Sequence, residues 1–322
     1  MNVCVIDPLP PSAVGALRSR LPTGHTLAVA TGADGDERDR LLADADILLV
    51  VHARVDAAVF ALAPRLRFVQ RLGVGYDNID LAAARAAGVT VAYAPGANSA
   101  AVAEHAVMLM LVVLRRLPYA AHRTREGAWP FAEMLASGVA DLEGSRVGLV
   151  GMGAIGCAVA ERLRPFGCHV SYHSRRRLGP EREAALGASH QDLDSLLADS
   201  DVISAHVPLT PETQGMFGRD AFARMRPGAV FINTARGELV DEEALHEAVA
   251  SGHLLGAGLD VLRSERGGPS PFADLPQVVV TPHYAGATRG SQARILRMGL
   301  ANVLRVLAGE RPENVLVEGS RL

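Results

Sequence analysis

The chain has 322 residues, of which 49% are hydrophobic and 21% charged, with a formal net charge of -3. This composition is typical of a soluble globular protein long enough for two domains, and the charge argues against nucleic acid as the main partner. All 32 basic residues are arginine, which excludes chemistry that needs a lysine, including Schiff-base and pyridoxal-phosphate enzymes and the Walker A loop.

The sequence predicts neither a membrane span nor a disulfide framework. The longest apolar stretch, 106–114, is too short to cross a bilayer. Asp7 and three nearby prolines interrupt the apolar start that a signal peptide needs, so we expect a cytoplasmic protein without a membrane partner. Cys4, Cys157 and Cys168 are odd in number and widely spaced, which predicts inert thiols and no metal site.

Short branched runs at 3–6, 27–30, 47–51 and 68–72 alternate with alanine-rich helical stretches, which predicts a parallel sheet in the first 95 or so residues. The charged segment 34–40 is interpreted as a solvated turn or helix start without function. In segment 71–77, glycines just past a strand expose backbone N–H groups at its carboxyl end. That segment is either a ligand loop or a plain turn.

A long apolar helix is expected at 98–114, with Asn98 or Ser99 as its cap, leading from a first domain into a second. Trp129 and Phe131 are expected in a loop, where they pack an interface or dimer contact. Segment 291–307 has the pattern of an amphipathic helix that returns to the first domain.

Segment 146–156 organises the middle of the chain. An apolar strand pattern ends at Gly151, Gly153 and Gly156, and a helical pattern follows. Such glycines permit a tight turn, backbone approach to a pyrophosphate and close helix packing, while the helix N-terminus attracts phosphate. An ordinary glycine turn would show the same three residues. The context favours a dinucleotide site, because Gly167 ends the helix and 168–172 supplies a second strand.

Four later strands, within 201–207, 231–236, 256–261 and 278–283, each end in polar residues. They deliver His206, Arg236, Asp260 and His283 to one sheet edge. Any one of them could be structural, but four beside a dinucleotide predict a site.

These motifs in order resemble the D-isomer-specific 2-hydroxyacid dehydrogenase family over nearly the whole chain, and its glyoxylate and hydroxypyruvate reductases in particular. The matching segments are 73–80, Asn98 with 102–105, 151–156, 206–213, 233–237, 256–261 and 281–283. The resemblance implies an α/β protein of two Rossmann-like, doubly wound parallel-sheet domains with a cleft between them. A discontinuous, flavodoxin-like substrate domain would comprise 1–98 plus 287–322, and the dinucleotide-binding domain 99–286. A homodimer is implied by analogy.

The resemblance also implies residue roles. His283 matches the general acid/base, Glu265 its carboxylate partner and Arg236 the residue that binds the substrate carboxylate. Val74, Gly75 and Asn98 match further substrate contacts, and Asp260 the residue that holds the nicotinamide amide. The other implied cofactor contacts are Val102, Gly151, Gly153, Ala154, Ile155, Gly156, Ser174, Arg175, Arg176, His206, Val207, Pro208, Thr213, Thr234, Ala235 and Gly286.

Elementary chemistry agrees with these roles. Hydride addition to a ketone develops alkoxide charge, and histidine can donate a proton near neutral pH. Arginine offers two parallel donors to a planar carboxylate. Two features depart from the family pattern. The loop 262–268 replaces the more usual acidic and proline-containing segment, and the residues after Tyr284 lack the aromatic residue often found shortly after the histidine.

The second strand of the nucleotide unit predicts NADPH as the preferred cofactor, with NADH as an alternative. No acidic residue that could bind ribose hydroxyls occurs between 167 and 180. Ser174 stands where that acid is expected and Arg175, Arg176 and Arg177 follow, so a 2′-phosphate could be held by charge-assisted hydrogen bonds. The alternative is a solvated basic run.

The favoured substrates are glyoxylate and hydroxypyruvate. Phosphite and phosphoglycerate dehydrogenases are alternatives, although no regulatory domain is expected beyond Leu322. Formate dehydrogenase is disfavoured because it has glutamine where Glu265 stands. An alternative of another class is a dinucleotide-sensing protein like the family's corepressors.

Overall fold

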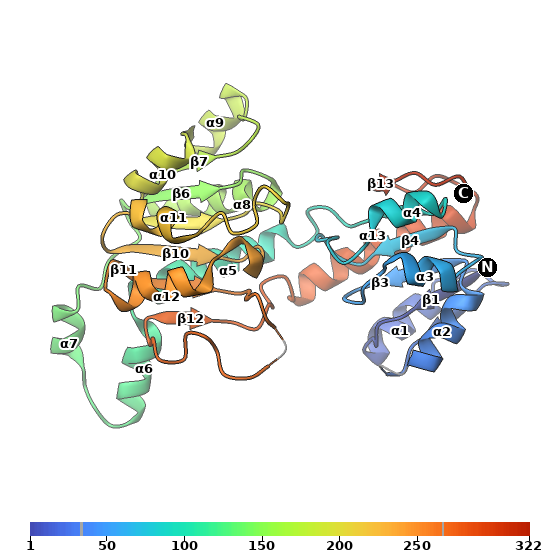
Figure 1. Ribbon diagram of the computed structural model, residues 1–322, viewed down its shortest axis with the longest axis horizontal. Coiled ribbons are helices and arrows are strands. Elements are labelled where there is room, and N and C mark those ends of the chain that lie inside the picture. The colour runs from blue at the N-terminus through green and yellow to red at the C-terminus, as the bar shows by residue number, and fades with distance from the viewer. Residues whose placement is uncertain (33–34, 266) are drawn as a thin grey trace. The chain divides into compact units, whose positions relative to one another are not determined.

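The structure is a computed structural model that describes residues 1–32, 35–265 and 267–322. The chain forms two compact units, one of Met1–Asn98 with Arg289–Leu322 and one of Ser99–Thr288. The sequence predicts boundaries after residues 98 and 286. Each unit is a mainly parallel sheet with helices on both faces (Figure 1), which is the doubly wound α/β class predicted from the sequence.

Within its described residues, the first unit has a six-stranded sheet in the order β13-β5-β4-β3-β1-β2. All neighbouring strands are parallel except β13, which pairs antiparallel with β5. The order β2-β1-β3-β4-β5 is that of flavodoxin-like folds, whose strand order reverses between β1 and β3. The strands are β1 (Asn2–Val5), β2 (Thr26–Val29), β3 (Ile47–Val50), β4 (Phe68–Arg71), β5 (Thr90–Ala92) and β13 (Val315–Val317).

Two apolar layers cover this sheet. One contains residues of α2 (Gly35–Asp44), α3 (Ala57–Leu62) and α4 (Leu81–Ala86). The other contains residues of α1 (Pro11–Arg18) and α13 (Arg289–Leu307). Because both faces are covered, β3 is buried along its whole length and has the continuous apolar sequence of a central parallel strand.

The second unit has, in its described residues, a seven-stranded sheet in the order β12-β11-β10-β9-β6-β7-β8, in which every neighbouring pair is parallel. The order reverses between β6 and β9. The strands are β6 (Arg146–Val150), β7 (His169–His173), β8 (Ala188–His190), β9 (Val202–Ala205), β10 (Ala229–Asn233), β11 (Leu254–Leu259) and β12 (Val278–Val280).

The helices of the second unit divide between the two faces. The apolar helix α5 (Ser99–Leu114) and α8 (Ala154–Leu163) share one core layer. The other layer contains α10 (Leu193–Asp199), α11 (Arg219–Arg224) and α12 (Glu242–Ala250). The remaining elements are α6 (Leu117–Arg125), α7 (Phe131–Ala136), α9 (Pro180–Leu186), η1 (Arg164–Phe166) and η2 (Gly237–Leu239).

The structure corrects some sequence expectations. Phe131 begins the helix α7, so the expected loop around Trp129 and Phe131 is wrong for the second of these residues. Strands β5, β8 and β13 were not predicted, because runs of three residues are too short to show a period. The charged segment 34–40 begins α2, but its Asp34 lies outside the described residues.

Among the helices described in these two units, none is both long and apolar enough to cross a membrane.

Candidate active site

The turn after β6 is shaped by glycines. Gly151 has φ +104°, and a Cβ there would lie 2.7 Å from the carbonyl carbon of His206. A Cβ at Gly156 would lie 2.2 Å from the carbonyl oxygen of Gly151, so helix and turn pack too closely for a side chain. Gly153 precedes α8 without a side-chain cap and faces open space. These features fit a pyrophosphate at the helix N-terminus.

Four strand ends share one edge of the second sheet. Strands β9, β10, β11 and β12 are consecutive parallel neighbours, so their carboxyl ends lie together. His206, Arg236, Asp260 and His283 follow these strands in that order. The predicted common edge is therefore confirmed by the sheet order, and it adjoins the glycine turn because β9 pairs with β6.

His283 and Glu265 form a histidine–carboxylate pair. Nδ1 of His283 lies 2.9 Å from Oε2 of Glu265, and the two side chains are 47% and 45% exposed. A carboxylate at Nδ1 orients the ring and leaves Nε2 for proton exchange. The backbone of His283 has φ +50°, a conformation that non-glycine residues rarely adopt and that recurs at active sites.

The segment that carries His283 is held by Asp260, which is 1% exposed. Its Oδ1 accepts hydrogen bonds from the Thr281 hydroxyl at 2.6 Å and the Tyr284 amide at 3.1 Å, and its Oδ2 accepts one from the Ala285 amide at 2.9 Å. The His283 amide donates to the Asp260 carbonyl at 2.8 Å. Asp260 thus anchors residues 281–285, in addition to the nicotinamide role that the resemblance implies.

A buried histidine on α5 adjoins this anchor. Nε2 of His105 lies 3.0 Å from the Thr281 hydroxyl and 3.4 Å from Oδ1 of Asp260. Burial lowers the pKa of His105, and the Asp260 charge opposes that shift. Sequence reasoning assigned neither His105 nor Thr281 a role, although both stand in matched motifs.

The turn that carries Arg236 is fixed by Asn233, which is 1% exposed. The Asn233 amide nitrogen donates to the Arg236 carbonyl at 2.8 Å, and its oxygen accepts from the Ala235 amide at 3.0 Å. Arg236 is partly buried and donates from Nη1 to the Ala235 carbonyl at 2.7 Å. A Cβ at Gly237 would lie 2.0 Å from the Leu262 carbonyl carbon, so this turn packs directly on the chain that leads to Glu265.

Two polar groups in the turns after β9 and β10 are buried without a hydrogen-bond partner in the described residues, Nδ1 of His206 and the hydroxyl of Thr234. Buried polar atoms usually have partners, so both groups fit contact with a ligand. His206 is joined to the Ser204 hydroxyl at 2.9 Å through Nε2, and burial lowers its pKa to about 4. It is therefore neutral at physiological pH. The Thr213 hydroxyl donates to the Pro208 carbonyl at 2.7 Å and shapes the same loop.

The three arginines of the basic loop after β7 differ in their contacts. Arg177 makes two 2.9 Å hydrogen bonds to Glu183, which also accepts one from Tyr172 at 2.7 Å. These contacts, Arg177 first, lower the pKa of Glu183 to about 2. Arg177 therefore holds the loop, while Arg175 and Arg176 are exposed beside the partly buried Ser174.

Three predicted substrate contacts belong to the first unit. Val74 and Gly75 follow β4 and are partly buried. Asn98 ends the unit, and its side-chain oxygen is buried without a partner in the part of the chain that the structure describes. All other predicted site residues, including Val102, Ala154, Ile155, Val207, Ala235 and Gly286, belong to the second unit.

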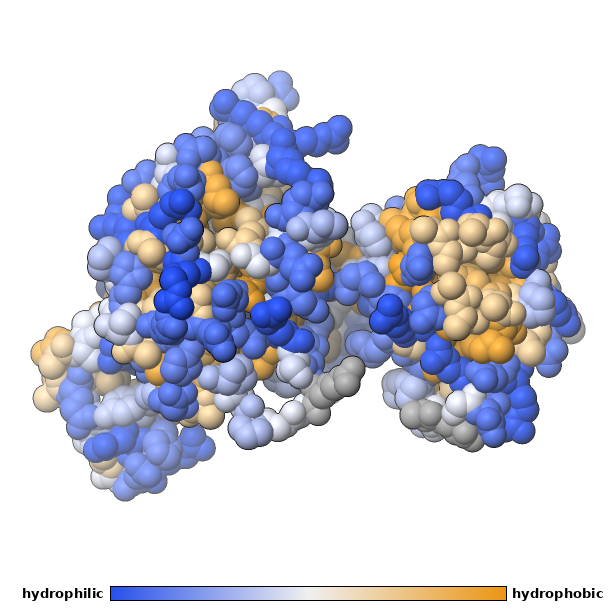
Figure 2. Space-filling view, viewed as in Figure 1, coloured by the Kyte–Doolittle hydropathy of each residue, from blue (hydrophilic) through white to orange (hydrophobic). Residues whose placement is uncertain are grey.

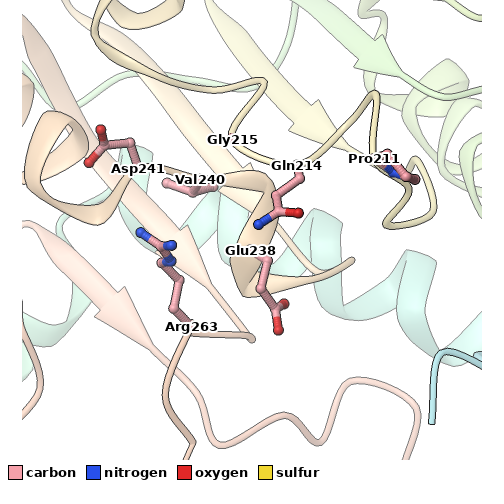
Figure 3. Close-up of a pocket in the computed structure, with 7 residues that line it drawn as sticks. All are labelled: Pro211, Gln214, Gly215, Glu238, Val240, Asp241 and Arg263. Carbon is pink, nitrogen blue, oxygen red and sulfur yellow. The ribbon is translucent and has the colours of Figure 1, made fainter.

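A separate pocket on the second unit is lined by Pro211, Gln214, Gly215, Glu238, Val240, Asp241 and Arg263 (Figure 3). The Arg263 side chain extends toward Asp241, and the Glu238 carboxylate points away from it (Figure 3). None of the predicted catalytic residues lines this mixed-charge pocket, which therefore differs from the His283–Glu265 site.

Comparison with known proteins gives consistent matches. The sequence profile of the D-isomer specific 2-hydroxyacid dehydrogenase NAD binding domain matches residues 107–285. A D-3-phosphoglycerate dehydrogenase of Mycobacterium bovis is 43% identical over 98% of this chain, but the chain spans only 59% of that protein. A glyoxylate reductase of Korarchaeum cryptofilum is 41% identical over 81% of this chain and 79% of its own length.

The solved structures agree. The TT0316 protein of Thermus thermophilus is 39% identical and has a TM-score of 0.88, covering 98% of this chain and 100% of its own. Together with the glycine turn and the common edge, these matches establish the family. The chain belongs to the D-isomer specific 2-hydroxyacid dehydrogenases.

Proposed function

We propose that the protein is an NAD(P)-dependent dehydrogenase that interconverts a 2-oxo acid and a D-2-hydroxy acid. The observation that carries the proposal is the 2.9 Å pair of His283 and Glu265. The pair belongs to the sheet whose glycine turn fits a pyrophosphate, so a proton donor and a dinucleotide site are built on one scaffold.

The glycine turn after β6 would hold the dinucleotide, whose nicotinamide would supply the hydride for the reduction. Arg236 binds the substrate carboxylate through its planar guanidinium. The resemblance also assigns Val74 and Gly75 of the first unit to substrate binding. His283 donates the proton from Nε2 to the developing alkoxide. Glu265 stabilises the imidazolium and holds the ring through Nδ1. Asn233 and Asp260 keep the Arg236 and His283 turns in place.

The favoured substrates are glyoxylate and hydroxypyruvate, for which the Korarchaeum cryptofilum glyoxylate reductase gives support. The second candidate is 3-phosphoglycerate, because the phosphoglycerate dehydrogenase similarity extends over 98% of this chain. The test measures oxidation of NADPH and NADH with glyoxylate, hydroxypyruvate, pyruvate, phenylpyruvate and phosphohydroxypyruvate. Turnover of phosphohydroxypyruvate above all others would select the second candidate, and no turnover of any 2-oxo acid would contradict the enzyme proposal.

NADPH is the proposed preferred cofactor. Ser174 takes the place of the ribose-binding acid, and Arg175 and Arg176 are exposed next to it. Arg175 is close enough to Glu212 to contribute to the lowered pKa of that carboxyl, after its hydrogen bonds to Thr210 and to backbone.

We also propose a homodimer that uses the α6–α7 segment. Four apolar side chains of this segment are exposed, namely Leu117 at 52%, Trp129 at 84%, Phe131 at 70% and Leu135 at 72%. Figure 2 shows apolar surface where this segment lies, at the lower left of the view. Such a patch on a protein surface marks an interaction site. A monomeric mass by analytical ultracentrifugation at micromolar concentration would contradict the proposal.

The alternative from another class is a dinucleotide-sensing protein without turnover. It is distinguished by NAD(P)H fluorescence titration, in which tight binding combined with no reduction of any 2-oxo acid would favour the sensor over the enzyme.

A further inference from the structure

We propose that His105 is a positioning residue for His283 and acts through Thr281 and Asp260. The inference rests on the proposed function, in which His283 is the proton donor. It concerns a contact between the middle of α5 and the segment 281–285, which are 176 residues apart in sequence at the His105–Thr281 hydrogen bond. None of the motifs of the chain indicates this contact by itself.

The hydrogen-bond directions follow from counting protons. The Thr281 hydroxyl has one hydrogen, and it lies 2.6 Å from a carboxylate oxygen of Asp260, which can only accept when ionised. Thr281 therefore donates to Asp260. Its oxygen must then accept from His105, whose Nε2 is 3.0 Å away. This requires the hydrogen of His105 on Nε2 and gives the relay His105 to Thr281 to Asp260.

The relay ends on the carboxylate that shapes the catalytic segment. Asp260 accepts the amides of Tyr284 and Ala285, on the two residues that follow His283. His283 itself is held at φ +50°, a conformation that persists only when its surroundings enforce it. Without the His105 donor, Thr281 can rotate its hydroxyl toward the Leu259 carbonyl, which lies 3.5 Å away. Asp260 then loses the hydrogen bond that the Thr281 hydroxyl donates, and the segment loosens.

His105 is buried, and its contacts are directed at the segment 281–285 and at Asp260. The side chain is 7% exposed, and its ring packs edge-on against Tyr284 with centroids 4.9 Å apart. Among the described residues, Asp260 is the charged group that faces it, at 3.4 Å. The neighbouring Glu104 on α5 pairs with Arg162 on α8 at 3.1 Å. Thr281 and Tyr284 belong to the segment that carries His283 and Asp260 anchors it, so these three contacts of His105 all lead to that segment.

The test uses disruptive and conservative variants of the same two residues. His105→Leu and Thr281→Val remove the relay, whereas His105→Gln retains a donor near Nε2 and Thr281→Ser retains the hydroxyl. His246→Gln is the matched control, because His246 also contacts a carboxylate, Asp274 at 3.0 Å, but on the surface of the same unit. The readout is the Cε1–Hε1 NMR cross-peak of His283 in protein with ¹³C-labelled histidine, assigned by its absence in His283→Ala.

We expect His105→Leu and Thr281→Val to move and broaden this cross-peak at a temperature well below unfolding. The conservative variants and His246→Gln should retain the native peak. With the substrate that the native protein turns over, kcat should fall about tenfold in the disruptive variants, which corresponds to a loss of about 1.4 kcal/mol of transition-state stabilisation. KM for the cofactor should change less than threefold.

An unchanged His283 peak in both disruptive variants would overturn the inference, even if their stability fell. A moved peak in a protein that reduces no 2-oxo acid would leave the positioning role in place and reject the proposed function. The two failures are therefore distinguishable.

Discussion

The two units have similar sheets but differ at the switch point, which is the place where the strand order reverses. In the first unit, the Asp7 carboxylate follows β1 and accepts the amides of Val51, His52 and Ala53 at 2.7, 2.8 and 2.8 Å. In the second unit, Gly151 follows β6, and Gly153 precedes α8 at its N-terminus without a side-chain cap. The same place in the topology is thus filled by a carboxylate in one unit and left to backbone in the other.

The difference shows why only one of the two crevices fits a dinucleotide. A switch point brings loops apart and exposes backbone donors, but those donors bind an external anion only if no internal one takes them. Asp7 supplies an internal anion, whereas the glycine turn supplies none. The sheet topology therefore determines where an anion can bind, and the residue just past the strand determines whether that anion is an internal carboxylate or an external ligand.

The largest effect is expected at the strand ends of the second unit. His283→Ala should lower kcat for reduction by about two to four orders of magnitude, because the proton donor is lost. Glu265→Gln should lower kcat less, since the amide still contacts Nδ1 but lacks the negative charge of the carboxylate that orients the ring. Steady-state kinetics across pH measures both. Near-native kcat in His283→Ala at neutral pH would remove the residue from the mechanism.

Removal of the Asp7 carboxylate from the switch point of the first unit should lower the stability of the protein. In Asp7→Ala, three amides lose a charged acceptor, and the free energy of unfolding in urea should fall by about 3 kcal/mol. Millimolar sulfate should restore part of this loss by occupying the vacated amides. The matched control is Asp56→Ala, which removes an acceptor at the start of α3 and should cost about 1 kcal/mol without sulfate rescue. Equal stability of Asp7→Ala and native protein would contradict this role of the Asp7 carboxylate.

The second unit, where no carboxylate occupies the backbone donors, is tested by its selectivity for NADPH over NADH. Ser174→Asp combined with Arg175→Ala should shift the ratio of kcat/KM for NADPH over NADH by about ten- to a hundredfold toward NADH. The reason is that a 2′-phosphate loses charge-assisted hydrogen bonds and meets a carboxylate. Arg177→Ala is expected to act through the loop, because its partner is Glu183. A native preference for NADH would reject the proposal.

Substitutions at two glycines of the turn should have different effects, because the surroundings of the two glycines differ. Gly156→Ala places a Cβ 2.2 Å from the Gly151 carbonyl oxygen and should cost about 1–3 kcal/mol of stability. Gly153→Ala meets nothing within 4 Å and should change stability by less than about 1 kcal/mol, yet weaken dinucleotide binding about tenfold. Thermal unfolding and NAD(P)H fluorescence distinguish the two. Full cofactor affinity in Gly153→Ala would place the pyrophosphate elsewhere.

The smallest effect concerns pH. Burial lowers the pKa of His206 to about 4, below its usual 6.5. As pH falls through 6.5, the unfolded chain binds a proton that the folded protein does not bind until about pH 4, so stability decreases across that window. Between pH 7 and 5.5 the loss is about 1 kcal/mol. His206→Asn should remove this part of the pH dependence in urea unfolding, and an identical dependence in both proteins would show that His206 is not the group responsible.

The sequence predicted the long and strongly patterned parts well. The helix expected at 98–114 is α5 at Ser99–Leu114, and the strand expected at 47–51 is β3 at Ile47–Val50. The family and the order of polar strand ends were also predictable, because each motif is local. Strands β5, β8 and β13 were not, since such short strands are defined by pairing with other segments, as β13 is by pairing with β5.

By itself the sequence determined the glycine turn, the α/β class and the residues that follow each strand, because these depend on local backbone requirements and on hydrophobic period. Only the tertiary structure decided which of those residues meet. It placed His105 against Thr281, and it assigned Arg177 to Glu183 while Arg175 and Arg176 stayed exposed. The contact between His283 and Glu265 was implied by the family resemblance, and the structure gives its geometry. Contacts between residues far apart in the chain depend on how sheets and helices pack, and no local pattern encodes that packing.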